Sequence, residues 1–115
     1  MLPRVARFDR TTFAQALRAG RRTHTPFFSL VKSPAPNFRV AVVVGKKVAK
    51  QSVARNRLRR RLYAAFAHVE PAPGHYILIA KAGSAALPYG ALEVEIARIL
   101  SLSMRAHVGA SRLAR

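Results

Sequence analysis

The chain contains no cysteine and only four acidic residues among its 115 positions. Without cysteine it forms neither disulfides nor thiolate metal sites, and cysteine usage does not indicate an oxidising or a reducing compartment. Four acids leave little material for an enzyme that holds metal or moves protons with carboxylates. We therefore expect no chemistry from this chain alone. The histidines show no ligand spacing and are predicted to be surface or turn residues: His24, His68, His75 and His107.

Long apolar runs are also absent from the sequence. No stretch approaches the roughly 20 apolar residues that a transmembrane helix needs. The N-terminal segment MLPRVARFDR lacks the apolar core of a secretory signal, so a cytoplasmic location is the expectation. The length predicts one domain over residues 1–115, with a frayed tail from about residue 109.

Positive charge dominates what is present. Lys and Arg number 21 and the net charge is +17. Between Asp9 and Glu70 there are fourteen Lys or Arg and no acid. Surfaces normally mix both signs, and self-repulsion on this scale destabilises a compact chain. A polyanionic partner, either nucleic acid or an acidic membrane, would offset that repulsion.

Residues 9–20 are predicted to form a short helix. Thr11 or Thr12 could cap this helix and Gly20 would end it. Its apolar residues recur at helical spacing, and they are Phe13, Ala16 and Leu17.

Three runs rich in β-branched and aromatic residues predict strands, namely TPFFSLVK, FRVAVVVG and HYILIAK. The second run is nearly all apolar from Val40 to Val44, which is typical of a strand covered on both faces. A final amphipathic helix is expected over residues 92–108. Its apolar stripe consists of Leu92, Ile96, Ile99 or Leu100, and Ser103.

The predicted fold class is α+β, an α/β sandwich with the order α-β-β-α-β-α. A small sheet of three or four strands, packed with helices, would bury the apolar stripes. The strand-helix-strand unit of residues 39–81 is expected to join two parallel neighbouring strands.

The central helix, predicted over residues 53–69, carries the strongest functional signal. Its apolar residues recur at spacings of three and four residues and form one stripe: Ala54, Leu58, Leu62, Ala65 or Phe66, and Val69. With Leu58 facing the core, a turn of 100° per residue places arginines on the opposite, exposed face. Like charges at i, i+4, such as Arg55 with Arg59, weaken this helix, and arginine is unfavourable near the positive end of its dipole. Bound phosphates would offset both costs. The residues expected to bind nucleic acid are Lys46, Lys47, Lys50, Arg55, Asn56, Arg57, Arg59, Arg60 and Arg61.

Asn56 lies at the middle of this arginine face. Its amide can both donate and accept a hydrogen bond, which suits a base edge or a 2′-OH better than a phosphate. The alternative is that Asn56 caps a helix that starts later than predicted.

The segment RVAVVVGKKVAKQSVARNRLRR resembles the signature of the bacterial ribonuclease P protein component. In that family an Arg-Asn-Arg core, an apolar residue and two basic residues lie on a helix that follows a strand and a Lys-Lys pair. The segments TTFAQALRAG and YILIAKAGSAAL also resemble the family's first helix, last strand and following loop. The matching residues here are Arg55, Asn56, Arg57, Leu58, Arg59 and Arg60.

The resemblance implies a subunit of a ribonucleoprotein endoribonuclease. A catalytic RNA subunit would remove the 5′ leader of precursor tRNA. Mg²⁺ would bind with the RNA subunit, and the protein alone would not bind it tightly. It also implies a left-handed strand-helix-strand crossover, against the usual rule. Arg57 and Arg60 would contact the RNA subunit. A cleft between sheet and helix would bind the leader through Phe13, Leu17, Phe28, Val31, Arg55, Asn56 and Arg59.

The sequence departs from the family pattern at three places. Tyr63 stands where the family usually has Arg or Lys. Leu17 and Val31 replace aromatics that often line the leader cleft, which predicts weaker base stacking. The segment before Phe13 is one residue short, so no N-terminal arginine is assigned to the cleft.

Other basic proteins share some of these features. A ribosomal or architectural RNA-binding protein would show the same charge and arginine helix, and it is the main alternative. A DNA partner is not expected, since strands and not a short helix-turn flank the arginine helix. A membrane partner is not expected either, because the apolar stripe is too narrow for a membrane-active helix.

Overall fold

A computed structural model describes residues 10–69 and 72–113, apart from the side chains of Arg10, Thr12 and residues 104–113. The helices and strands follow one another along the chain in the order α-β-β-β-α-β-α, with a short 3-10 helix before the last α-helix. In sequence they are α1 (Arg10–Ala19), β1 (Arg21–His24), β2 (Phe28–Ser33), β3 (Phe38–Val43), α2 (Ser52–Val69), β4 (Gly74–Ala80), the 3-10 helix η2 (Ser84–Ala86) and α3 (Tyr89–Leu113).

The strands form one four-stranded sheet in the order β1-β2-β4-β3. β2 pairs antiparallel with both β1 and β4, whereas β3 and β4 are parallel. The parallel pair on either side of α2 confirms the expected strand-helix-strand unit. β1 was not predicted, because RRTH has no apolar alternation and is defined only by its pairing with β2.

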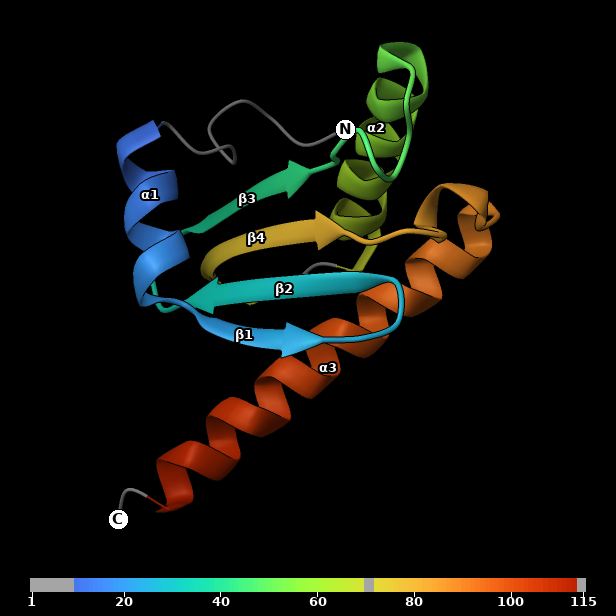
Figure 1. The fold of residues 1–115 in the computed structure, drawn as a ribbon. Coiled ribbons are helices and arrows are strands. Elements are labelled where there is room, and N and C mark those ends of the chain that lie inside the picture. Colours follow the sequence, from blue (N-terminus) through green and yellow to red (C-terminus); the bar gives the residue numbers. More distant parts are fainter. Residues whose placement is uncertain (1–9, 70–71, 114–115) are drawn as a thin grey trace.

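Helices cover both faces of this sheet (Figure 1). α1 lies in front of the sheet, while α2 and α3 lie behind it. β3 and β4 point in the same direction, and the chain passes behind the sheet through α2 from the upper strand to the lower one. This path is a left-handed crossover, as the family resemblance implied.

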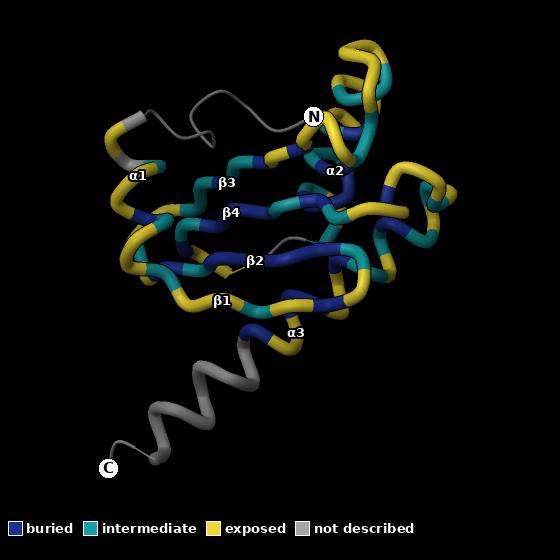
Figure 2. Tube along the Cα trace, in the orientation of Figure 1, coloured by how far each residue is buried: buried dark blue, intermediate teal, exposed yellow. Residues whose placement is uncertain are grey.

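β2 and β4 are buried along most of their length (Figure 2), and the core forms one cluster on each face of the sheet. The larger cluster lies on the side of α2 and α3, where Phe28, Leu30, Tyr76 and Leu78 alternate inward from the central strands. The smaller cluster lies under α1 and consists of Ala16, Val31 and Ile77, with Phe13, Leu17, Ala41 and Ile79 packed against it.

Gly20 allows α1 to connect tightly to the sheet. A Cβ at this position would lie 2.4 Å from Cγ1 of Val31 and 2.7 Å from the carbonyl oxygen of Ala16. The Gly20 amide donates to that same oxygen at 2.9 Å, so the helix ends here as predicted.

Several predicted boundaries need correction. α1 begins at Arg10, so Thr11 and Thr12 lie inside the helix and do not cap it. α3 begins at Tyr89 and is helical through Leu113, so most of the tail expected to fray is helix. β3 is an edge strand, and Val43 is 37% exposed, so this strand is not covered on both faces throughout.

Candidate nucleic-acid interface

Helix α2 has two dissimilar halves. The buried side chains Leu58, Leu62, Ala65 and Phe66 confirm the predicted apolar stripe, and three of these four lie in residues 62–69. The first turns of α2 extend past the β3 edge of the sheet (Figure 1). Residues 52–61 therefore present most of their circumference to solvent.

Exposed cations cover this free end of α2. Arg57, Arg60 and Arg61 are exposed on the helix, and three lysines are exposed on the preceding loop. Two ion pairs occur among the described residues, His68–Glu93 and Arg98–Glu95, and neither involves this end of α2. We call this set the α2 basic surface: Lys46, Lys47, Lys50, Arg57, Arg60 and Arg61.

Arg55 binds the loop that precedes its own helix. Its Nη1 donates to the carbonyl oxygens of Ala49 at 3.0 Å and Lys50 at 2.7 Å. The sequence predicted an outward guanidinium, but the side chain folds back because two loop carbonyls lie within its reach. Arg55 thereby orders the segment that carries the lysines of the α2 basic surface.

Asn56 lies inside the helix and orients a neighbouring arginine. Because α2 begins at Ser52, Asn56 is in the second turn and does not cap the helix, which removes the alternative left open by the sequence. Its Oδ1 accepts a hydrogen bond of 2.8 Å from Nη1 of Arg59. Among the described hydrogen bonds none uses the amide nitrogen of Asn56, so this donor remains available on the surface.

The residues predicted to line a leader cleft lie in two groups. Phe13, Leu17 and Val31 belong to the α1 side of the sheet, whereas Arg55, Asn56 and Arg59 are on α2, which packs on the other side. The groups can meet only around the β3 edge.

Two of these predicted cleft residues are fully buried. Val31 lies beneath α1 and belongs to the smaller core cluster. Phe28 belongs to neither group, because its side chain packs into the core under α2 and α3. The prediction for Phe28 is corrected: strand alternation turns it away from Val31. The exposed Val43 was missed, although the alternation of β3 places it on the α1 side with Ala41.

Tyr63 has a structural role at the same edge. Its hydroxyl accepts a hydrogen bond of 3.3 Å from the amide of Val42 in β3. An edge strand leaves backbone donors unpaired, and this contact satisfies one of them. Tyr63 therefore links α2 to the sheet.

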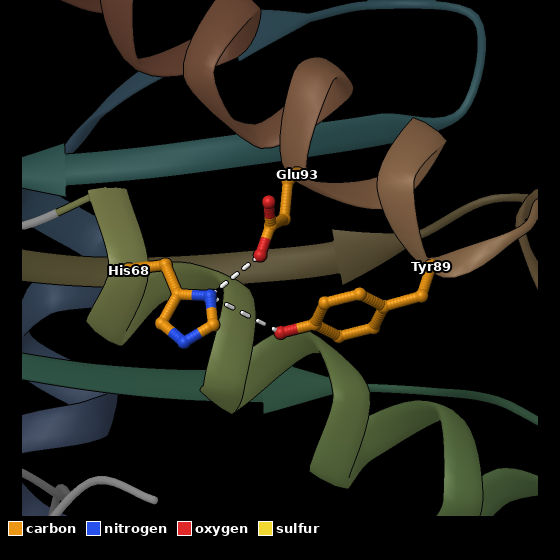
Figure 3. A network of polar contacts seen from close by, with 3 residues as sticks. All are labelled: His68, Tyr89 and Glu93. Atoms are coloured by element: carbon orange, nitrogen blue, oxygen red, sulfur yellow. Dashed lines mark hydrogen bonds and ion pairs between the residues drawn. The ribbon is translucent and has the colours of Figure 1, made fainter.

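The other end of α2 joins α3 through a polar network (Figure 3). Nδ1 of His68 lies 2.6 Å from Oε1 of Glu93 and 3.5 Å from the hydroxyl of Tyr89. The hydrogen bond with His68 lowers the pKa of Glu93. Partial desolvation, followed by the charge of Glu93, raises the pKa of Tyr89.

The remaining histidines have separate surroundings. His24 lies 2.7 Å from Oγ of Ser29, and burial, followed by the charge of Arg39, lowers the pKa of His75. The side chain of His107 is outside the described residues. In the part of the chain that the structure describes, no three His, Asp or Glu side chains gather to hold a metal. No helix within those described residues is long and apolar enough to cross a membrane.

These features define a class of protein: a small, strongly basic α+β sandwich with an arginine-rich helix extending past the sheet. The family model for Ribonuclease P matches residues 2–102, and the chain belongs to this family.

Relatives agree with this assignment. The ribonuclease P protein component of Thermus aquaticus is 35% identical over 89 residues, 77% of this chain and 54% of the relative. That of Synechococcus sp. (strain JA-2-3B'a(2-13)) is 34% identical over 110 residues, covering 87% and 83%. The chain spans about half the length of the Thermus relatives that it matches.

Solved structures share the fold. The RNase P protein of Staphylococcus aureus superimposes with a TM-score of 0.77 at 17% identity, over 85% of this chain and 94% of that one. The protein from Thermotoga maritima gives 0.69 at 18% identity, over 79% and 90%. The three helices and four-stranded sheet are thus those of RNase P proteins.

Proposed function

We propose that this chain is the protein subunit of ribonuclease P and that the α2 basic surface binds the catalytic RNA subunit. One observation carries the proposal: a family member exposes a cationic helix end without an acid partner among its described residues. Arginine forks bind phosphates in a bidentate manner, and the free amides at a helix start favour the same anions. Arg57 and Arg60 are the proposed direct contacts.

The proposed second role is to bind the 5′ leader of precursor tRNA. The path would run around the β3 edge, between Phe13 and Leu17 on one side and Asn56 and Arg59 on the other. Exposed Val43 lies on the α1 side at this edge and would contact bases. The free amide donor of Asn56 suits a base edge or a 2′-OH.

The reaction itself is assigned to the RNA subunit with Mg²⁺. The two described acids, Glu93 and Glu95, both lie on α3 and not on the α2 basic surface. Glu93 pairs with His68, and Glu95 lies 3.9 Å from Arg98. The protein's residues would bind phosphates, hold the leader and lower repulsion between the RNA strands. Cleavage would be endonucleolytic and would give the mature tRNA 5′ end, in the cytoplasm.

Reconstitution tests this proposal. The pure chain should not cleave precursor tRNA in magnesium, while chain plus ribonuclease P RNA should cleave it faster at low salt than the RNA alone. An Arg57→Ala/Arg60→Ala variant should lose most of this stimulation. Cleavage by rigorously RNA-free protein contradicts the assignment of catalysis. RNA binding with no stimulation at any salt concentration would favour a ribosomal or architectural protein instead.

A further inference from the structure

A pocket of about 350 Å³ lies at the end of the sheet opposite the α2 basic surface. The α2 loop leaves from the end of β3, whereas this pocket lies where β1 and β3 begin and β2 ends. Its volume falls within the range of small-molecule sites, about 300–1,000 Å³. It is lined by Arg21, Lys32, Pro34, Pro73 and Ser103, with two alanines.

Two cations face each other at this pocket. Arg21 and Lys32 are directly opposite in the antiparallel pairing of β1 with β2, so they lie on the same side of the sheet. Like charges in that position repel and destabilise a sheet. Neither forms an ion pair with any acid that the structure describes. A bound anion would remove the repulsion.

Tyr76 holds two parts of the pocket wall in place. Its ring lies 5.6 Å from Nζ of Lys32, a cation–π contact that holds the ammonium group near the pocket. Its hydroxyl donates to the carbonyl oxygen of Ala72 at 2.7 Å, which fixes the turn that carries Pro73. Because Tyr76 is itself buried, one rigid side chain positions both a cation and an apolar wall.

The wall residues restrict the ligand further. Proline rings and alanines offer an apolar surface beside the cations, and Ser103 adds a hydroxyl. A nucleotide combines a phosphate with a flat, largely apolar base and a sugar bearing hydroxyl groups. A lipid headgroup would need an apolar surface outside the pocket for its chains, and the lining residues provide none beyond the prolines and alanines.

We propose that this pocket binds one nucleotide of single-stranded RNA, with Arg21 and Lys32 on its phosphate and its base against Pro34 and Pro73. The proposal rests on the proposed function in one respect, namely that the protein binds RNA. It adds a second RNA contact, on the far end of the sheet from α2. An RNA strand could then be held at both ends of the molecule.

The test uses the full chain and adenosine 5′-monophosphate, followed by amide NMR shifts. The nucleotide should shift amides of Lys32, Ala35 and Ser103 in a saturable manner. Arg21→Gln/Lys32→Gln should raise the dissociation constant read at Ala35 and Ser103 by about tenfold or more, since both positive charges that strengthen the hydrogen bonds to the phosphate are removed. The matched control, Arg18→Gln/Arg22→Gln, removes the same charge from exposed positions outside the pocket and should change it less than about twofold.

Partial ligands separate the sources of binding. Inorganic phosphate and adenosine should each bind more weakly than the complete nucleotide. If inorganic phosphate binds as tightly as the nucleotide, the pocket is an anion site only and the proposal is overturned. Adenosine that binds as tightly as the nucleotide would also overturn it. Phosphatidylserine vesicles that displace the nucleotide from the pocket would overturn the assignment to RNA.

A single-stranded RNA completes the test. For a short oligouridylate, the slope of log K against log salt should flatten by about 0.7 for each phosphate that the pocket variant no longer neutralises. The control variant should keep the wild-type slope. If the pocket amides do not shift, or if both variants weaken nucleotide binding equally, the pocket proposal is refuted and the ribonuclease P assignment is unaffected. Failure of the cleavage reconstitution, with pocket shifts intact, refutes the ribonuclease P assignment alone.

Discussion

The two halves of α2 differ in what holds them in place. Residues 62–69 contain Leu62, Ala65 and Phe66 in the core, whereas residues 52–61 bury Leu58 alone and carry five arginines. The first turns lie beyond the sheet edge (Figure 1). The C-terminal half attaches the helix to the fold, and the N-terminal half is held out from it as a binding surface. Substitutions in the two halves should therefore affect different measurements.

The largest effect is expected in the attached half. Phe66 is fully buried and its ring centroid lies 6.1 Å from that of Tyr76. Phe66→Ala should lower the free energy of unfolding by about 3–5 kcal/mol, because it creates a cavity in the main core. Denaturant titration checks this. A decrease below about 1 kcal/mol would mean that the attached half does not hold the helix.

The boundary between the halves is tested at Tyr63. Tyr63→Phe keeps the ring and removes the hydroxyl that accepts from the Val42 amide. The free energy of unfolding should fall by about 1 kcal/mol, the usual net value of one hydrogen bond. The salt dependence of RNA binding should not change. If RNA binding weakens and stability does not, Tyr63 belongs to the binding surface.

Asn56 probes the free half without changing charge. Asn56→Ala should weaken binding of leader-bearing precursor tRNA to the holoenzyme by about 1 kcal/mol and spare mature tRNA. The bond to Arg59 suggests repeating the substitution in an Arg59→Ala background. If Asn56→Ala has no further effect there, Asn56 only positions Arg59. If its effect of about 1 kcal/mol persists, the amide contacts the leader.

The smallest effect is expected where α2 meets α3. Glu93 has a pKa held below its ordinary value of 4.5, chiefly by the hydrogen bond with His68. A depressed carboxyl pKa stabilises the fold above the ordinary value, and this contribution is lost as pH falls through the folded pKa. Glu93→Gln should therefore show a smaller drop in Tm than wild type between about pH 6 and pH 3. His68→Ala should behave like Glu93→Gln. If either variant shows the same drop in Tm as wild type, the His68–Glu93 pair does not stabilise the fold.

Periodicity predicted the parts of the fold that depend on burial. The stripe through Leu58 and Leu62 and the final helix stripe follow from spacing alone, since each helix must cover the sheet. β1 was missed because four polar residues become a strand only when β2 supplies the pairing.

Side-chain direction was the part of the site that could not be predicted. The sequence placed Arg55 and Asn56 on the right helix, yet their partners depend on rotamers and on a loop conformation. The alternation of β2 does separate Phe28 from Val31, but only once the strand is known. The pocket joins Arg21, Lys32 and Pro73, which are too far apart in sequence to suggest a site.

The central claim is that the free half of α2 neutralises RNA phosphates. The most direct measurement is the affinity of the chain for ribonuclease P RNA across a range of salt concentrations. Arg57→Ala/Arg60→Ala should flatten the slope of log K against log salt by about 0.7–0.9 per contact, with circular dichroism and unfolding free energy near wild type. The control, Arg18→Ala/Arg22→Ala, removes equal charge elsewhere and should keep the slope. An unchanged slope in a folded Arg57→Ala/Arg60→Ala variant would contradict the claim.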